Sequence, residues 1–226
     1  MHTISRALVL ATRNRGKIAE LATLFADFDL EIKGLDAFPE IPEIPETGDF
    51  FLENARIKAR TVAAATGLVA VADDSGLEVD CLGGKPGVYS ARYAGPPPPG
   101  DTRSADQRNY EKLLLALNGV PDAQRTARFR CALVACAPVP AGSHELAAEA
   151  SWEGLIALSP QGKLGFGYDP IFFVPAAGKT AAMMDKGEKN HYSHRGQALQ
   201  KLRAAWPEFW AAVQEGGFMI EIPQSE

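Results

Sequence analysis

Two neighbouring aspartates pose the first chemical question in this sequence. The apolar run of residues 68–72 leads straight into Asp73 and Asp74, and Ser75 with Gly76 predicts a turn at the end of a buried strand. Adjacent carboxylates repel each other, and burying an unpaired charge is costly, so we expect a compensating cation nearby. An isolated aspartate pair is more typical of an ordinary turn at a strand end.

A basic segment near the N-terminus offers a site for an anion. "ATRNRGK" follows a short apolar strand and opens a helix predicted over residues 14–28, which places Thr12, Asn14 and Lys17 around a helix N-terminus. Lysine there can act as a point charge on a phosphate. The segment is not a P-loop, because the first glycine of that motif is missing and Ile18 replaces its hydroxyl residue. A solvated helix start capped by threonine is the alternative, and these residues alone leave both open.

Taken together, the two segments predict a site for magnesium and phosphate. Each is expected to follow a strand, and α/β proteins bind ligands beyond the carboxyl ends of their strands. Mg²⁺ is held by one or two carboxylates together with phosphate oxygens, so it would neutralise the aspartates and bridge them to a phosphate at Lys17. Glu43 and Glu46, in a proline-punctuated loop over residues 38–49, are further candidate ligands.

Three more segments carry candidate residues. Lys58 shares a helix face with Asn54 and could reach the same site, although a solvated helix lysine is the commoner case. "GFGYDP" could present an aromatic ring to a base, or it could simply plug a core. "EKNHYSHRG" groups Lys189, His191, His194 and Arg195; with no third zinc ligand evident, hydrogen-bond donation to a ligand fits better than a metal site.

Strands and helices are mixed along the chain. Helices are predicted over residues 49–65, from Ser104 to the following glycine, and in a tail that begins near Lys189. Two alternating strands, over residues 127–139 and 144–158, predict a hairpin. The pattern indicates an α/β fold with a central mixed sheet flanked by helices and an active-site cleft between two lobes. No linker separates domains, so residues 1–226 are expected to form a single domain whose hairpin-bearing lobe spans roughly residues 127–180.

Composition excludes several functions. A formal net charge of -5 argues against a polymer of nucleic acid as the partner. The three cysteines have no metal-binding spacing and are expected to be reduced and buried, as in a cytoplasmic protein. No apolar run is long enough to cross a membrane, and none marks a secretory signal.

At this point five separated segments resemble the inosine triphosphate pyrophosphatase family, which hydrolyses ITP, dITP and XTP. They occur in the family's order between residues 10 and 199: "LATRNRGKIAEL", "ETGDFFLENARIKA", "ADDSGLEVDCLGGKPGVYSARY", "GFGYDPIFFVP" and "EKNHYSHRGQAL". The resemblance implies an elongated two-lobed α/β fold, a homodimer, and Mg²⁺-dependent cleavage of a purine nucleoside triphosphate to nucleoside monophosphate and pyrophosphate.

The resemblance also implies roles for individual residues. Glu46 and Asp74 correspond to the magnesium ligands, with Asp74 also the general base and Asp73 supporting it. The remaining positions correspond to substrate-binding residues: Thr12, Arg13, Asn14, Arg15, Gly16 and Lys17 for the triphosphate, Lys58 and Ser75 for the substrate more generally, Phe166, Gly167, Tyr168 and Asp169 for the base, and Lys189, His194 and Arg195 for the 6-oxo group of the purine.

Two departures from the family pattern stand out. Arg13 replaces a glycine found in many relatives, which adds charge near the phosphates. The tract "PPPPG", beginning at Pro96, replaces a shorter polar loop and leaves the local loop path open. Two other functions fit the residues less well: a pyrophosphatase for modified pyrimidine nucleotides, and a nucleotide-sensing or RNA-binding module that grips phosphates without cleaving them.

Overall fold

The structure is a computed structural model that describes residues 7–14, 17–18, 21–22, 25–28, 30–138 and 144–215. Its seven-stranded sheet has the order β2-β1-β3-β4-β5-β6-β7, with β1 parallel to β2 and β3, and β6 antiparallel to β5 and β7. The strands are β1 (Ala7–Leu10), β2 (Glu31–Gly34), β3 (Val69–Val79), β4 (Thr126–Cys136), β5 (Glu145–Ile156), β6 (Phe172–Val174) and β7 (Lys179–Thr180). The helices are α2 (Phe51–Thr66), α3 (Ala105–Ala116), α4 (Lys186–Tyr192) and α5 (His194–Glu215).

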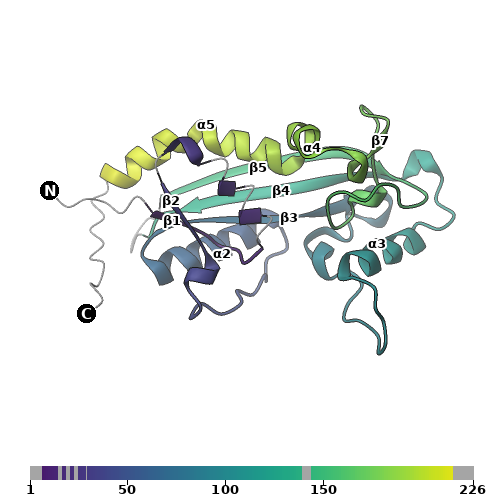
Figure 1. Cartoon of the computed structure of the whole chain (residues 1–226), viewed down its shortest axis with the longest axis horizontal. Helices are drawn as coiled ribbons and strands as arrows, with labels where there is room; N and C mark the ends of the chain where they lie inside the picture. The colour runs from purple at the N-terminus through teal and green to yellow at the C-terminus, as the bar shows by residue number, and fades with distance from the viewer. Residues whose placement is uncertain are drawn as a thin grey trace. The chain divides into compact units, whose positions relative to one another are not determined.

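The predicted fold class is confirmed: the sheet is mixed and helices flank it (Figure 1). The chain divides into two compact units, which are described separately below. The first unit comprises residues 1–74, 132–149 and 198–226, and the second comprises residues 75–131 and 150–197. The single domain and the cleft between two lobes stay predictions. No helix in the described part of the chain is long and apolar enough to span a membrane.

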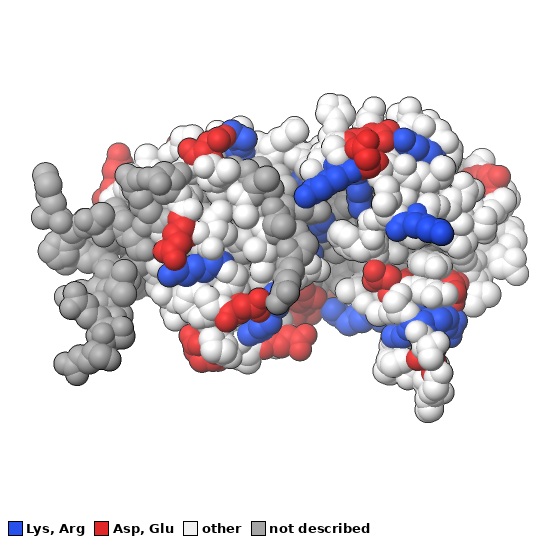
Figure 2. Space-filling model, in the orientation of Figure 1, with Lys and Arg blue, Asp and Glu red and all other residues white. Residues whose placement is uncertain are grey.

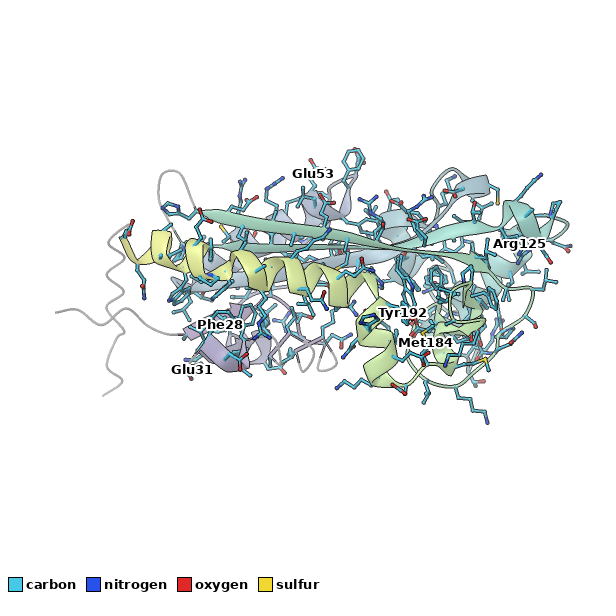
Figure 3. All side chains as sticks on the ribbon, turned by 90° about the horizontal axis from the view of Figure 1, so that it is seen from above. Phe28, Glu31, Glu53, Arg125, Met184 and Tyr192 are labelled. Atoms are coloured by element: carbon cyan, nitrogen blue, oxygen red, sulfur yellow. The ribbon has the colours of Figure 1, made fainter. Side chains whose placement is uncertain are left out.

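In the first unit, helices cover both faces of the sheet. Figures 1 and 3 show α2 on one face of the strands and α5 on the other. Helix α2 buries Ala55, Ala59 and Val62, which recur at helical spacing and let the helix lie close to the sheet. It ends at Gly67, whose φ of +66° favours glycine. Both bounds lie within two residues of the sequence prediction.

Strand β3 corrects the prediction of a turn at Ser75 and Gly76. The strand starts at Val69 and continues to Val79, so Asp73 and Asp74 lie inside it and do not follow its end. Every residue from Val69 to Asp74 is buried. A strand can carry two neighbouring buried carboxylates when each has a basic partner, and those partners come from distant positions in the sequence. The local pattern therefore read as a strand end.

In the second unit, α3 begins as predicted. The Ser104 hydroxyl accepts a hydrogen bond from the Gln107 N–H at 3.1 Å, which is the geometry of a helix N-cap. Arg125, which directly precedes β4 (Figure 3), is 3% exposed. Its guanidinium donates to the backbone carbonyls of Leu117, Ile156 and Ala157 at 2.7–3.0 Å. One buried cation thereby joins the end of α3 to the end of β5.

The tail is two helices and not the single helix predicted from residue 189. Helix α4 starts at Lys186 and ends at Tyr192, and α5 starts at His194. Between them Ser193 has extended backbone, with ψ of 148°, and its hydroxyl accepts from the Gly196 N–H at 3.1 Å. Serine in this position starts a new helix because its side chain replaces the missing acceptor of the first turn.

The predictions for the loops, the cysteines and the first helix have different outcomes. The loop of residues 38–49 and the exposed tract of residues 95–101 lack regular structure, as predicted. Cys131 and Cys136 are buried, but Cys81 is exposed, so the prediction of burial is wrong there; none of the three forms a disulfide in the described part of the chain. In the first predicted helix residues 17, 18, 21 and 22 are helical, and its other parts, like the hairpin turn at residues 140–143, lie partly or wholly outside the described residues.

Candidate active site

The segment after β1 forms a helix start, as its sequence predicted. The Asn14 Oδ1 accepts from the Lys17 N–H at 3.2 Å, and the Thr12 Oγ1 accepts from the Asn14 N–H at 3.1 Å. The cap of the helix is therefore the asparagine, supported by the threonine behind it. Arg15 and Gly16 lie outside the described residues. This segment turns Lys17 toward strand β3.

Lys17 pairs with the first of the two aspartates. Its Nζ donates to the Asp73 Oδ1, and the Asp73 side chain is only 1% exposed. Arg13, by contrast, donates to the Ile41 carbonyl in the proline-punctuated loop at 2.6 Å. The arginine that departs from the family pattern thus fastens a loop to this segment in the first unit.

Lys58 holds the second aspartate together with Glu46. Its Nζ lies 2.9 Å from the Glu46 Oε1, 2.9 Å from the Asp74 Oδ1 and 2.8 Å from the Asp73 carbonyl oxygen. The ammonium group has three donors, and these three acceptors occupy all of them. Glu46 and Asp74 therefore share one cation, which is the Lys58 ammonium, and their role as magnesium ligands stays a prediction.

Burial and charge shift the protonation of this cluster. Burial raises the pKa of Asp74 to about 6, even though Lys58 pulls it down. Burial alone would lower the pKa of Lys58, but Asp74 and Glu46 outweigh it, so the pKa of Lys58 is raised and the ammonium stays charged. The Asp74 carboxylate is thus poised to exchange a proton near neutral pH while its lysine partner remains a cation.

A buried amide positions the loop that carries Glu46. The Asn54 side chain on α2 is fully buried, and its Oδ1 accepts from the Gly48 N–H at 2.8 Å. Asn54 and Lys58 share a helix face as predicted, and both act on the same loop. Glu43 is exposed, so of the two candidate ligands in the loop only Glu46 reaches Asp74 through a shared partner.

In the second unit, the loop that the sequence assigned to the base is built around Asp169. This carboxylate is 3% exposed, and its Oδ2 accepts from the Phe166 N–H at 2.9 Å and from the Lys189 Nζ. Burial raises the pKa of Asp169, against the pull of Lys189. Gly165 is required beside it: its φ is +78°, and a Cβ there would lie 2.0 Å from the Asp169 Oδ2.

Phe166 is 49% exposed, and two cations lie over its ring. The Lys189 Nζ is 4.9 Å and the Arg195 Cζ 5.6 Å from the ring centroid, which are cation–π distances. A flat ring that is half open and flanked by hydrogen-bond donors is suited to stacking on a heterocycle while the donors meet its polar edge.

His194 and Arg195 are buried at the start of α5. The His194 ring stacks on Phe129 with a centroid distance of 4.8 Å and an interplanar angle of 14°. The Arg195 Nη2 donates to the Ser75 Oγ at 3.0 Å. Contacts therefore link Phe166, Lys189, Asp169 and Arg195 in the second unit, whereas the His194 ring lies against Phe129 and Trp152.

Two hydrogen bonds that fix this loop were not predicted from the sequence. The Asp106 Oδ2 on α3 accepts from the Gly167 N–H at 2.8 Å. The Tyr168 hydroxyl donates to the Ser90 carbonyl at 2.8 Å, and burial raises the pKa of that hydroxyl. Tyr168 was predicted to bind the base, but it is 4% exposed and acts here as an anchor. For Asp106, position in the first turn of α3 offered no signal of a partner 61 residues away.

The carboxylates of Glu46 and Asp74 suit a metal ion that takes its other coordinating oxygens from a bound phosphate compound and from water. No group of three or more His, Cys, Asp or Glu side chains is arranged to hold a metal within the described stretches. However, the Asp74 Oδ2 is buried and has no hydrogen-bond partner among the residues described. Two carboxylates completed by phosphate oxygens and water match the preference of Mg²⁺. Basic and acidic side chains are interspersed on the face drawn in Figure 2, unlike a continuous basic surface for a nucleic-acid duplex.

The fold and these residues define an α/β protein with a lysine-bridged carboxylate pair. Comparison with known proteins gives its family: the model of the Ham1 family matches residues 8–205, and the chain belongs to that family. A dITP/XTP pyrophosphatase of Nitratidesulfovibrio vulgaris is 58% identical over 205 residues, covering 90% of this chain and 97% of the relative. The dITP/XTP pyrophosphatase of Lactococcus lactis is 50% identical over 208 residues, covering 91% and 98%.

A solved structure of a HAM1 protein from Coxiella burnetii is similar throughout. It has a TM-score of 0.80 and 43% sequence identity, and the match covers 89% of this chain and 98% of that one. The resemblance read from the five sequence segments is confirmed by these matches.

Proposed function

We propose that this chain hydrolyses the non-standard purine nucleotides dITP, ITP and XTP to a nucleoside monophosphate and pyrophosphate. Relatives at 50–58% identity are named dITP/XTP pyrophosphatases. The observation that carries the proposal is the shared cation position between Glu46 and Asp74, with Lys17 paired to the neighbouring Asp73. Clearing such nucleotides would keep them out of nucleic acid synthesis.

Glu46 and Asp74 would hold Mg²⁺, which the buried Asp74 Oδ2 supports. When bound, the ion supplies charge neutralisation and polarisation of the phosphates. A site of three carboxylates and two lysines has one excess negative charge, which opposes a triphosphate unless a metal accompanies it. The geometry therefore favours a nucleotide that arrives as a metal complex.

The chain's own residues divide the remaining work on the phosphates. Lys17 would bind the triphosphate by its charge, and the dipole of the helix that starts at Asn14 would favour the same anion. Asp74 would take a proton from the water that attacks the α-phosphorus, for which its pKa of about 6 is suited. Asp73 keeps Lys17 in place between turnovers.

Residues of the second unit would recognise the base. Phe166 would stack on the purine, and Lys189, His194 and Arg195 would donate to its 6-oxo group. Adenine would turn a 6-amino donor toward these donors, and sites built on such hydrogen bonds reject the wrong partner by a factor on the order of 10⁴. This arrangement favours hypoxanthine and xanthine over adenine.

A substrate panel tests the function directly. The purified chain is incubated with ITP, XTP, GTP, ATP and a modified pyrimidine triphosphate with magnesium, and the phosphate product is identified. Pyrophosphate from ITP and XTP, with little from the others, is expected. Orthophosphate as the product, or equal turnover of ATP, would refute the proposal.

The role of Asp74 is tested by Asp74→Asn, with Asp36→Asn at an exposed position as the matched control. We expect turnover of ITP to fall at least roughly 100-fold in the first variant, because general base catalysis contributes about 10²–10⁴. Binding of ITP and the folded state should persist. Near-parental turnover in Asp74→Asn would remove Asp74 as the base. The homodimer and the cytoplasmic location stay predictions, and analytical ultracentrifugation measures the first.

A further inference from the structure

Lys58 occupies the position that a metal ion would need. Its Nζ is equally far, at 2.9 Å, from one oxygen of Glu46 and one oxygen of Asp74, and a third bond to the Asp73 carbonyl fixes it there. The Lys58 side chain is 11% exposed and the Asp74 side chain 9% exposed, so little water competes for these bonds. The ammonium is thus a buried counter-ion placed between two carboxylates.

We propose that Lys58 and the divalent cation exchange places: the ammonium neutralises Glu46 and Asp74 in the metal-free protein, and the incoming cation displaces it. The freed ammonium then turns to the phosphates that accompany the metal. This inference rests on the proposed function, because it takes the metal to arrive with a nucleotide. It concerns when the metal binds and not which residues hold it.

Displacement follows from the acceptors that are already in use. A divalent ion bound to both carboxylates would draw its ligand oxygens to about 2.0–2.1 Å, which leaves no room for an ammonium between the same oxygens. Two cations at that distance also repel each other strongly in a site of low polarity. The ammonium must leave for both carboxylates to serve as ligands.

One oxygen of Asp74 is available as a metal ligand while Lys58 is still in place. The Asp74 Oδ2 is buried and has no hydrogen-bond partner in the described part of the chain, whereas the Asp74 Oδ1 is held by Lys58. Because the Oδ2 is buried, an incoming cation reaches it as the ammonium begins to move away, and Glu46 then supplies the second ligand. The loop of Glu46, held to α2 by Asn54, keeps that second ligand within reach.

The exchange couples metal binding to nucleotide binding. Without phosphates the displaced ammonium gives up its hydrogen bonds to Glu46 and Asp74, and the metal alone has to offset their loss. With phosphates present the ammonium is compensated. By linkage, nucleotide then raises metal affinity and metal raises nucleotide affinity by the same factor.

Binding of Mn²⁺, measured from the electron paramagnetic resonance signal of the free ion, tests the exchange without any turnover. The proteins are the parent, Lys58→Met, Lys58→Gln and Lys58→Arg, with Lys33→Met as the control because Lys33 on strand β2 pairs with the exposed Glu31. We expect Lys58→Met and Lys58→Gln to bind Mn²⁺ at least 10-fold more tightly than the parent when no nucleotide is present. Lys58→Arg and Lys33→Met should bind like the parent.

Repeating the titration with inosine 5′-(α,β-methylene)triphosphate measures the coupling. The analogue should tighten Mn²⁺ binding to the parent by a larger factor than to Lys58→Met or Lys58→Gln. Unchanged or weaker Mn²⁺ binding by both neutral variants without nucleotide, with circular dichroism showing a folded protein, would overturn the exchange. If the parent fails to cleave ITP but the neutral variants still bind Mn²⁺ more tightly, the proposed function fails and the exchange stands.

Discussion

The two glycines of the base loop give a matched test of how Asp169 holds that loop. Gly165 and Gly167 both have positive φ, at +78° and +61°, so alanine is strained at either position. They differ in their surroundings: a Cβ on Gly165 would lie 2.0 Å from the Asp169 Oδ2 and 3.2 Å from the Lys189 Nζ, whereas a Cβ on Gly167 meets nothing within 4 Å.

The expected free energies follow from these surroundings. Left-handed backbone costs an L-residue about 1–2 kcal/mol, which is the whole expected effect of Gly167→Ala. Gly165→Ala must also push the Asp169 carboxylate away from Phe166 and Lys189, and loss of a hydrogen bond to a charged group costs about 1.5–3 kcal/mol more. We therefore expect Gly165→Ala to lower the free energy of unfolding by about 2.5–5 kcal/mol in total.

Thermal and denaturant unfolding of the two variants and the parent measure this difference. In a chain of this length about 1 kcal/mol corresponds to roughly 2–4 °C in Tm, so Gly165→Ala should melt about 3–12 °C below Gly167→Ala. Any gain from a stiffer unfolded chain is shared by both variants and cancels in the comparison. Equal stability of the two variants would show that the Asp169 contacts do not hold the loop.

Two further predictions concern the same loop. Asp106→Ala should raise the KM for ITP several-fold and change kcat less, because the Gly167 N–H loses its acceptor and Phe166 loses its fixed position. Asp101→Ala, on the neighbouring loop, is the control. An equal fall in kcat and kcat/KM would contradict a positioning role for Asp106. The pKa of Asp169 is raised in the folded state, so its contribution to stability is full below the ordinary value of 3.8 and is lost as pH rises through the raised value. Asp169→Asn should therefore show a smaller fall in Tm over that pH range than the parent. Identical slopes of Tm against pH in the two proteins would count against the raised pKa.

Much of the fold could be predicted from the sequence because residues that are close together in the chain determine it. The apolar spacing of α2, its glycine stop and the Ser104 cap of α3 are determined by nearby residues, and the structure agrees with each. The start of a second helix at Ser193 could also have been predicted, since serine is a preferred N-cap residue and its hydroxyl accepts from the Gly196 N–H. That signal was overlooked inside a segment that looked continuously helical.

The candidate site was predictable by residue type and less by arrangement. The need for a cation beside Asp73 and Asp74 followed from electrostatics, but the identity of their partners depends on contacts across 56 and 16 positions of sequence. The extension of β3 through both aspartates was missed for the same reason. Asp106 acts across a similar separation, and such pairings arise from tertiary packing that one sequence without the structure does not show.

The three hydrogen bonds of the buried Arg125 guanidinium have a consequence for the stability of the second unit in acid. Its three acceptors are the backbone carbonyls of Leu117, Ile156 and Ala157, so no carboxylate has to stay ionised for these bonds to persist. Acid that protonates the carboxylates of ion pairs elsewhere in the molecule should leave these three hydrogen bonds in place. The junction between α3 and the end of β5 should therefore be among the last parts of the second unit to exchange its amide hydrogens as the solution is acidified.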